Sequence, residues 1–253
     1  MKNMKKKILS VALTLVMSIA SLTGCGSSSS DKIVFGTNAE FPPFEYISTN
    51  GVIDGYDGID MAIASKIGEI SGKDVEIANM EFDSLLVAIQ NGQIDAAIAG
   101  MTATEERAKT VDFSTPYYTA TQVMVVKEGS DIKTAADMEG KAIAVVQGYT
   151  GETVVQDLGY KYEAFKKGTE CILELVNGKC DVVVIDSATA KDFVGDNEGL
   201  VIVEDSNAFE SEEYAIAVKK GNTELLKTIN EAIEKMLADG TISDFAAKYA
   251  DAN

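Results

Sequence analysis

The sequence has no histidine, only three cysteines and three prolines, and few basic residues. Without histidine there is no His-dependent catalytic triad, no histidine general base and no histidine metal ligand. Three cysteines are too few for a disulfide scaffold. Lys and Arg number 22 against 40 for Asp and Glu, which gives a net charge of -18. So acidic a surface argues against nucleic acid as a partner, because binding phosphate requires a basic face.

What is present is the composition of an ordinary globular protein. Of its 253 residues, 46% are hydrophobic and 25% are charged, which is neither a disordered nor a fibrous composition. The length accommodates one large or two ordinary domains.

The first 24 residues have the pattern of a secretory signal peptide. Four lysines precede an apolar stretch of 15 residues, 8–22, which is short of the roughly 20 residues that span a membrane. The stretch ends in Leu22-Thr23-Gly24-Cys25, which resembles a bacterial lipoprotein processing site and implies cleavage before Cys25 and a lipid on its thiol. Residues 25–30 then form a flexible tether. A short membrane anchor is the alternative. The lipoprotein prediction places the protein on the extracellular face of the cell membrane, held by its lipid.

Two further cysteines, Cys171 and Cys180, are expected to be separate buried thiols. A helix is predicted at 169–177, and Cys180 stands nine positions after Cys171; nine residues of helix would extend over about 13 Å. A disulfide requires Cα atoms within about 7 Å, and a metal site is less favoured still.

Beyond residue 31 the chain alternates apolar strands with amphipathic helices. Strands are predicted at 32–36, 75–79, 96–99, 123–126, 142–146, 162–165, 182–185, 200–203 and 214–218. Helices are predicted at 59–70, 83–90, 104–110, 151–157, 169–177, 187–194, 223–238 and 242–250. In the first helix, Ile59, Ile63, Ile67 and Ile70 form one apolar stripe. This alternation predicts an α/β fold with mostly parallel sheets flanked by helices.

A weak internal repeat favours two similar lobes. Residues 86–100 and 173–186 each contain a helix, an Asn-Gly stop, an Asp and an apolar strand. Gly92 and Gly178 suit the left-handed position that ends a helix. Such units also recur by chance in α/β proteins, and chance is an equal alternative here. If the repeat is real, both segments end at the sheet edge where open α/β proteins bind ligands.

The segment 99–107 leaves a predicted strand and enters a predicted helix. Thr102 and Glu105 fit a capping box, and the free N–H groups of a helix start form an anion site. Arg107 adds a planar fork that matches a carboxylate, and Gly100 lets a ligand approach the backbone. An ordinary capped helix with a solvated arginine is the alternative.

Asp186 ends a fully apolar strand, where an acid either caps the next helix or binds a cation. The loop 145–151 is similar to an anion nest but lacks the lysine of a nucleotide-binding loop. Phe41 and Phe82 stand near strand ends, where aromatic residues more often belong to the core than to a site.

Six segments, taken in order, resemble the polar amino acid solute-binding proteins (family 3) of bacterial ABC importers. These segments are 37–45 (Thr-Asn-Ala-Glu-Phe-Pro-Pro-Phe-Glu), 58–60, 100–107, 111–118, 147–152 and 182–186. The resemblance covers about residues 31–250 and implies a two-lobed, type II periplasmic-binding-protein fold. The implied parts are lobe 1 (31–116 plus 215–253), lobe 2 (122–209) and two hinge crossings (117–121 and 210–214).

The resemblance also implies a site for a free amino acid between the lobes. Arg107 would hold the α-carboxylate with Thr102 and the backbone at Gly100. From lobe 2, Thr150 would meet the same carboxylate and Asp186 would take the α-ammonium. The full set of expected ligand-binding residues is Asn38, Phe41, Phe82, Gly100, Met101, Thr102, Arg107, Gln147, Tyr149, Thr150 and Asp186.

The expected wall for the ligand side chain consists of Phe41, Phe82 and Tyr149, beside Asn38. Many relatives have an acid at the position of Asn38, and often Gly-Thr-Thr where this chain has Gly148-Tyr149-Thr150. Because an amide does not neutralise a buried ammonium, we expect a polar uncharged ligand of glutamine size or smaller rather than lysine. Aromatic faces also bind a guanidinium, so arginine stays open.

We therefore expect a monomeric binding protein, without metal or cofactor, that delivers an amino acid to ABC permease transmembrane subunits. The alternative is an enzyme on the same fold, such as an amino-acid or prephenate-type dehydratase. Such an enzyme needs a general acid or base, for which Glu40, Asp186 or a tyrosine would have to serve. A sensor's ligand domain is less favoured, since no spanning helix or signalling domain follows Asn253.

Overall fold

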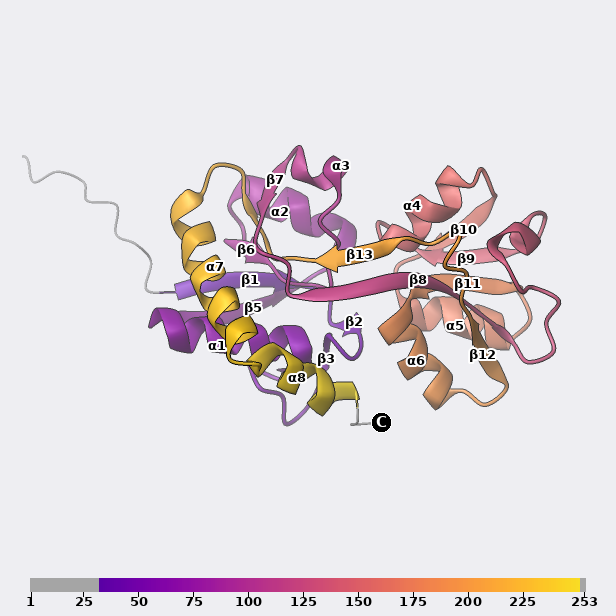
Figure 1. Ribbon diagram of the computed structural model, residues 1–253, viewed down its shortest axis with the longest axis horizontal. Helices are drawn as coiled ribbons and strands as arrows, with labels where there is room; N and C mark the ends of the chain where they lie inside the picture. The colour runs from indigo at the N-terminus through magenta and orange to yellow at the C-terminus, as the bar shows by residue number, and fades with distance from the viewer. Residues whose placement is uncertain (1–31, 251–253) are drawn as a thin grey trace, which may run out of the picture. The chain divides into compact units, whose positions relative to one another are not determined.

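The computed structural model describes residues 32–250, so the predicted signal peptide, Cys25 and the tether lie outside the described residues. Within residues 32–250, no helix is both long enough and apolar enough to cross a membrane. The described chain forms two larger sheets and one small sheet, with helices packed against them (Figure 1).

The first sheet is five-stranded, in the order β5-β1-β6-β14-β7. Its strands are β1 (Lys32–Thr37), β5 (Asp74–Asn79), β6 (Ala96–Ala97), β7 (Val111–Phe113) and β14 (Ala217–Lys219). β1 runs parallel to β5 and β6, whereas β14 runs antiparallel to β6 and β7. The helices associated with this sheet are α1 (Ile59–Ser71), α2 (Leu85–Asn91), α7 (Thr223–Ala238) and α8 (Thr241–Ala250).

The second sheet is six-stranded, in the order β10-β9-β11-β8-β12, with β13 pairing with β8. Its strands are β8 (Tyr118–Lys127), β9 (Ile143–Val146), β10 (Tyr162–Phe165), β11 (Val182–Asp186), β12 (Leu200–Val203) and β13 (Ser211–Tyr214). β9 is parallel to β10 and β11, and β8 is antiparallel to β11 and β12. The helices associated with it are α4 (Thr150–Asp157), α5 (Gly168–Val176) and α6 (Ser187–Asp196).

A pair of antiparallel strands links the two larger sheets. β8 and β13 lie side by side (Figure 1), with Tyr214 opposite Tyr118 and Ser211 opposite Thr121. The predicted hinge crossings, 117–121 and 210–214, fall on this pair, while the limits of the two lobes stay a prediction.

The remaining short elements lie close to the ends of the first sheet's strands. A small sheet is formed by β2 (Glu40–Phe41), β3 (Glu45–Ile47) and β4 (Tyr56–Asp57). The others are the 3-10 helix η1 (Phe82–Ser84) and the single-turn helix α3 (Glu105–Ala108). None of β2, β3, β4 and β7 was predicted from the sequence, because strands of two or three residues are too short to show alternation.

Most predicted helices and strands are present with ends shifted by a few residues. The apolar stripe of α1 is confirmed, with Ile59, Ile63 and Ile67 buried. The predicted strand 214–218 is instead split between β13 and β14. Both large sheets are mixed, because the strands that link or return between the sheets run against their neighbours.

Two smaller predictions are also confirmed. Cys171 and Cys180 are buried free thiols. Gly92 and Gly178 both have φ of 70°, the left-handed conformation expected where α2 and α5 end.

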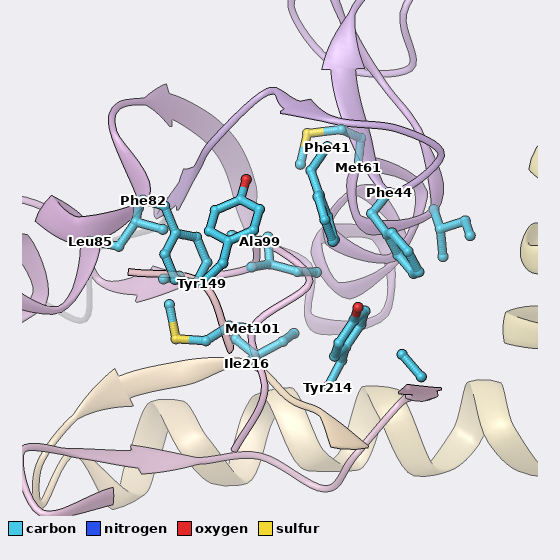
Figure 2. Close-up of a cluster of buried hydrophobic side chains, with 14 of the residues drawn as sticks. Phe41, Phe44, Met61, Phe82, Leu85, Ala99, Met101, Tyr149, Tyr214 and Ile216 are labelled. Atoms are coloured by element: carbon cyan, nitrogen blue, oxygen red, sulfur yellow. The ribbon is translucent and has the colours of Figure 1, made fainter. Parts of the chain in front are cut away.

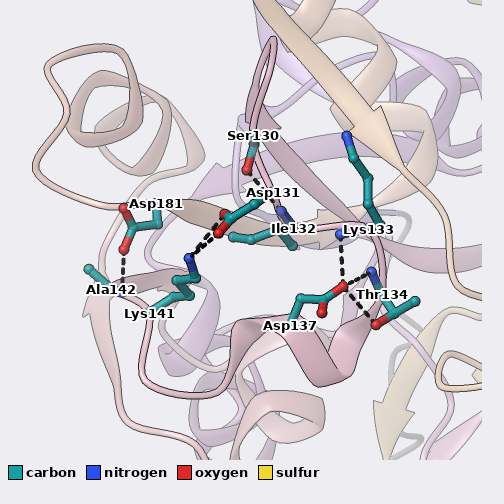
Figure 3. Close-up of polar contacts among 9 residues, drawn as sticks. All are labelled: Ser130, Asp131, Ile132, Lys133, Thr134, Asp137, Lys141, Ala142 and Asp181. Carbon is teal, nitrogen blue, oxygen red and sulfur yellow. Dashed lines mark hydrogen bonds and ion pairs between the residues drawn. The ribbon is translucent and has the colours of Figure 1, made fainter.

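The connection between β8 and β9 is ordered by acidic side chains (Figure 3). Asp137 accepts hydrogen bonds from the backbone N–H and the hydroxyl of Thr134, at 2.9 Å each, and forms a capping box at the 3-10 helix η2 (Ala135–Met138). The Lys141 ammonium lies 3.0 Å from the Asp131 carboxylate. Such exposed pairs contribute little individually, but together they fix a connection that has no strand of its own.

Candidate functional site

The predicted site residues lie on segments from both large sheets. The first group lies after β1 and β6 and in β2, η1 and α3: Asn38, Phe41, Phe82, Gly100, Met101, Thr102 and Arg107. The second group lies after β9 and at the end of β11: Gln147, Tyr149, Thr150 and Asp186. Three hydrogen bonds join the groups: Tyr149 Oη to Asn38 Oδ1 (2.9 Å), Thr102 Oγ1 with Thr150 Oγ1 (3.1 Å), and Arg107 Nη2 to the Gly148 carbonyl (2.9 Å).

Arg107 is directed into this junction by the turn before α3. Its Nη1 donates to the Thr102 carbonyl at 2.8 Å, and its guanidinium carbon lies 5.2 Å from the centre of the Phe82 ring. Burial lowers the pKa of Arg107, while the charges of Glu212 and Asp186 oppose that effect. Within residues 32–250 the guanidinium bonds only neutral carbonyls. Of its five N–H donors, some therefore remain for an anion.

The Thr102 hydroxyl connects an acid, Glu212, to the hydroxyl of Thr150. The Thr102 hydroxyl donates to Glu212 Oε2 at 2.7 Å and is also bonded to Thr150. Glu212 belongs to β13, and Gln122 Nε2 approaches the same carboxylate oxygen at 3.5 Å. Glu212 was not predicted from the sequence, because only the pairing of β13 with β8 brings it here.

Asp186 ends β11 as a buried carboxylate, 2% exposed. It is the residue before α6, but its side chain makes no capping hydrogen bond and instead accepts one from the Tyr214 hydroxyl. Burial, and then the charge of Glu212, raise the pKa of Asp186 to about 7. The neighbouring Gln122 Oε1 is buried and has no hydrogen-bond partner among the described residues. A buried acceptor of this kind needs a donor, which a cation next to Asp186 would supply.

A second pair of buried carboxyl groups supports the turn that holds Gly100. Asp60 Oδ2 accepts hydrogen bonds from the Gly100 N–H at 2.7 Å and from the Tyr117 hydroxyl at 2.9 Å. Burial raises the pKa of Asp60 to about 6. Glu45 is also fully buried; burial, and then the neighbouring Asp60, raise its pKa well above the usual range. The raised pKa favours the neutral form of Glu45, which avoids two adjacent buried charges.

Besides donating its N–H to Asp60, residue 100 has to be a glycine for steric reasons. Its φ is 51°, and a Cβ there would lie 2.5 Å from the Phe41 ring. The sequence predicted that this glycine lets a ligand approach the backbone; the structure shows Phe41 in that place.

The aromatic residues form one continuous cluster (Figure 2). Phe41 stacks on Phe44 at 5.5 Å between ring centres, and Phe44 contacts Tyr214 edge-on at 5.1 Å. On its other side Phe41 meets Tyr149, which in turn meets Phe82. The cluster therefore links the predicted side-chain wall to the Tyr214 hydroxyl that bonds Asp186.

The structure contradicts one expectation, the helix cap at Thr102, and gives the surroundings of Gln147 and Met101, whose roles as ligand-binding residues stay predictions. Gln147 is exposed, and only its backbone N–H is engaged, by the Phe165 carbonyl at 2.8 Å. Met101 is fully buried, and its carbonyl accepts from Ala215. Thr102 is not the helix cap.

Thr104 caps α3 instead, by accepting from the Arg107 N–H at 3.2 Å. Because α3 is a single turn, its start is not the anion site that the sequence predicted. In the segment 99–107, the groups left to bind a carboxylate are the Arg107 side chain and the Thr102 hydroxyl.

A family model matches nearly the whole described chain. Residues 33–252 match the model of bacterial extracellular solute-binding proteins, family 3. The chain is 31% identical to the arginine-binding extracellular protein ArtP of Bacillus subtilis, over 90% of this chain and 92% of ArtP. It is 32% identical to the ABC transporter glutamine-binding protein GlnH of the same organism, over 96% of this chain and 97% of GlnH.

A solved structure extends the comparison to the fold. The structure of an ancestral arginine-binding protein bound to glutamine has a TM-score of 0.80 and is 43% identical, covering 87% of this chain and 97% of that chain. Its similarity agrees with the two-lobed α/β architecture expected from the sequence. On these matches, the chain belongs to the family 3 bacterial extracellular solute-binding proteins, whose relatives include the amino-acid-binding proteins of ABC transporters.

Proposed function

We propose that this protein captures a free amino acid between two lobes and delivers it to the transmembrane subunits of an ABC permease. In this proposal lobe 1 consists of 31–116 with 215–253, lobe 2 of 122–209, and the hinge of 117–121 with 210–214. The protein acts outside the cell as a monomer, held to the membrane by a lipid on Cys25.

One observation carries the proposal: the half-buried guanidinium of Arg107 and the buried carboxylate of Asp186, from opposite sides of the junction, face the same place. A free amino acid carries both charges a few ångströms apart. Arg107, with two hydrogen bonds to neutral carbonyls, fits its carboxylate, and Asp186, beside the unpartnered oxygen of Gln122, fits its ammonium. Burying either charge alone costs several kcal/mol. Because neither sheet supplies both partners, ligand binding favours the arrangement in which the two sheets meet.

The class of ligand follows from the side-chain end of the site. The relatives named above bind arginine and glutamine, so their names leave the charge of the ligand open. In this chain Asn38 is an amide, and the proposed wall of Phe41, Phe82 and Tyr149 contains no carboxylate. We therefore propose a polar uncharged amino acid, because lysine would bring an unpaired ammonium into the wall. Arginine keeps the option of stacking on the aromatic rings.

A calorimetric screen of the purified protein against all common amino acids tests this function. Saturable binding of at least one α-amino acid, with the amino acid recovered unchanged, is the expected result. A ligand present at about 100 times its dissociation constant also raises the stability of the protein by about 2.7 kcal/mol, which a thermal-shift assay detects. No binding by any amino acid, or conversion of the amino acid to a product, contradicts the proposal; conversion would instead indicate a dehydratase-type enzyme.

A further inference from the structure

Tyr149 occupies the space that the proposed function gives to the ligand side chain. Its ring lies between those of Phe41 and Phe82 (Figure 2), with centres 5.2 Å and 4.6 Å apart and planes at 89° and 63°. Both contacts are edge-to-face, the arrangement that aromatic pairs prefer. Tyr149 is only 6% exposed. The two phenylalanines expected to flank a ligand therefore flank a side chain of the protein itself.

Asn38, the polar group at the end of this space, is engaged at both its oxygen and its nitrogen. Its Oδ1 accepts from the Tyr149 hydroxyl at 2.9 Å, and its Nδ2 donates to the Met80 carbonyl at 3.2 Å. A ligand group that displaced the Tyr149 hydroxyl from the Asn38 oxygen would leave that hydroxyl buried without this partner. Leaving a buried donor unsatisfied is costly, so Asn38 serves to hold Tyr149 in place.

The backbone that carries Tyr149 is fixed on both sides of the preceding residue. The Gly148 carbonyl accepts from Arg107, and the Gly148 N–H donates to Glu152 at 2.6 Å. Gly148 has φ of 81°, and a Cβ there would approach Asp83 at 3.3 Å. The residue that grips the ligand carboxylate in the proposed function thus also sets where the Tyr149 ring enters.

Two partly exposed ion pairs lie next to the two phenylalanines in sequence. Lys166 contacts Asp83 at 2.8 Å, next in sequence to Phe82, and Lys167 contacts Glu40 at 2.6 Å, next to Phe41. Both lysines lie between β10 and α5, on the side of the site that also supplies Tyr149. Both pairs therefore connect the segment after β10 to the segments that carry Phe82 and Phe41.

We infer that Tyr149 sets an upper limit on the ligand side chain, at about the size of alanine, serine or cysteine. These amino acids place their α-carboxylate and α-ammonium at Arg107 and Asp186 without displacing the Tyr149 ring. Glutamine, lysine and arginine have to displace it and break its bond to Asn38. The inference depends on the proposed function and narrows its ligand class.

Titration calorimetry on the purified protein and on two variants tests the limit. The wild type is expected to bind serine, alanine or cysteine more tightly than glutamine or arginine. Tyr149→Thr removes the ring and should improve glutamine or arginine relative to serine by about tenfold or more, because these ligands then no longer have to displace a packed aromatic ring. Tyr149→Phe is the matched control: it keeps the ring, loses only the hydroxyl, and should retain most of the selectivity for small side chains.

The outcomes distinguish the size limit set by Tyr149 from the proposed function, amino acid binding. Tight binding of glutamine or arginine by the wild type, with the same selectivity in Tyr149→Thr, overturns the size limit and leaves amino acid binding intact. No binding of any amino acid by the wild type overturns both. If Tyr149→Thr does not fold, the selectivity of the wild type and of Tyr149→Phe still decides.

Discussion

Replacing Arg107 by alanine should abolish amino acid binding while the protein stays folded. In the proposed complex, the Arg107 guanidinium pairs with the ligand carboxylate, so removing it leaves that carboxylate buried without a cationic partner. Truncating one partner of a buried charge pair costs about 2–5 kcal/mol. At 1.4 kcal/mol per factor of ten, the dissociation constant should rise from about 30-fold to several thousand-fold.

The effect on the ligand-free protein should be smaller. Arg107→Ala removes two hydrogen bonds, to the carbonyls of Thr102 and Gly148, each worth about 1.5–3 kcal/mol when the donor is charged. It also removes a charge whose burial is itself unfavourable, as its lowered pKa indicates. These contributions oppose each other, so the free protein should unfold at a somewhat lower temperature but cooperatively.

Calorimetry measures the binding, and a thermal melt without ligand measures the fold. Lys109→Ala is the control, because Lys109 is exposed, two residues further along, and bonded only to Glu106. Arg107→Lys keeps the charge but loses the fork, and should bind weakly rather than not at all. Near-wild-type affinity in a folded Arg107→Ala protein would refute the reasoning.

Three other perturbations have defined outcomes. Cys25→Ser should release the protein from the membrane into the medium with unchanged ligand affinity, as cell fractionation would show; retention equal to the wild type contradicts the lipoprotein hypothesis. Affinity should rise as the pH increases from about 5 to about 8, because the pKa of Asp186 is raised to about 7 and only its ionised form pairs with an ammonium. Asp186→Asn should bind weakly and without that rise, whereas a flat wild-type profile in calorimetry argues against Asp186 as the ammonium partner. Gly100→Ala should lower the melting temperature by several degrees, because the new Cβ would meet Phe41 at 2.5 Å and φ is 51°; an unchanged melt contradicts this account of the turn.

The sequence predicted those parts of the fold that repeat over several residues. The isoleucine stripe of α1 and the apolar runs of β9 and β11 needed no partner to be recognised. Arg107 and Asp186 were identified because each stands at a boundary between a strand and a helix. Thr102 was taken for a helix cap because Thr102 and Thr104 both precede the same acidic turn, and only backbone geometry distinguishes them.

The residues that sequence analysis missed are positioned by distant contacts. Glu212 and Tyr214 reach the site only through the register of β13 on β8. Glu45 and Asp60 are charged residue types that would ordinarily be expected on the surface. Their burial depends on each other and on Tyr117. The packing of Tyr149 between Phe41 and Phe82 likewise depends on the approach of two segments that are far apart in the chain.

The position of β14 in the first sheet has a consequence for how the chain assembles. β14 lies between β6 and β7, so Ala217 pairs with both Ala97 and Phe113. The strands β8 to β12 of the second sheet, by contrast, come from one uninterrupted stretch. During synthesis or refolding, the strands β8 to β12 can pair with one another as soon as residues 118–203 are complete. β6 and β7 cannot complete their pairing until β14, which comes later in the chain, is available. Since pairing between distant segments is slow, the first sheet should finish last, and a chain cut before β14 would leave two strands with unpaired edges, a template for aggregation.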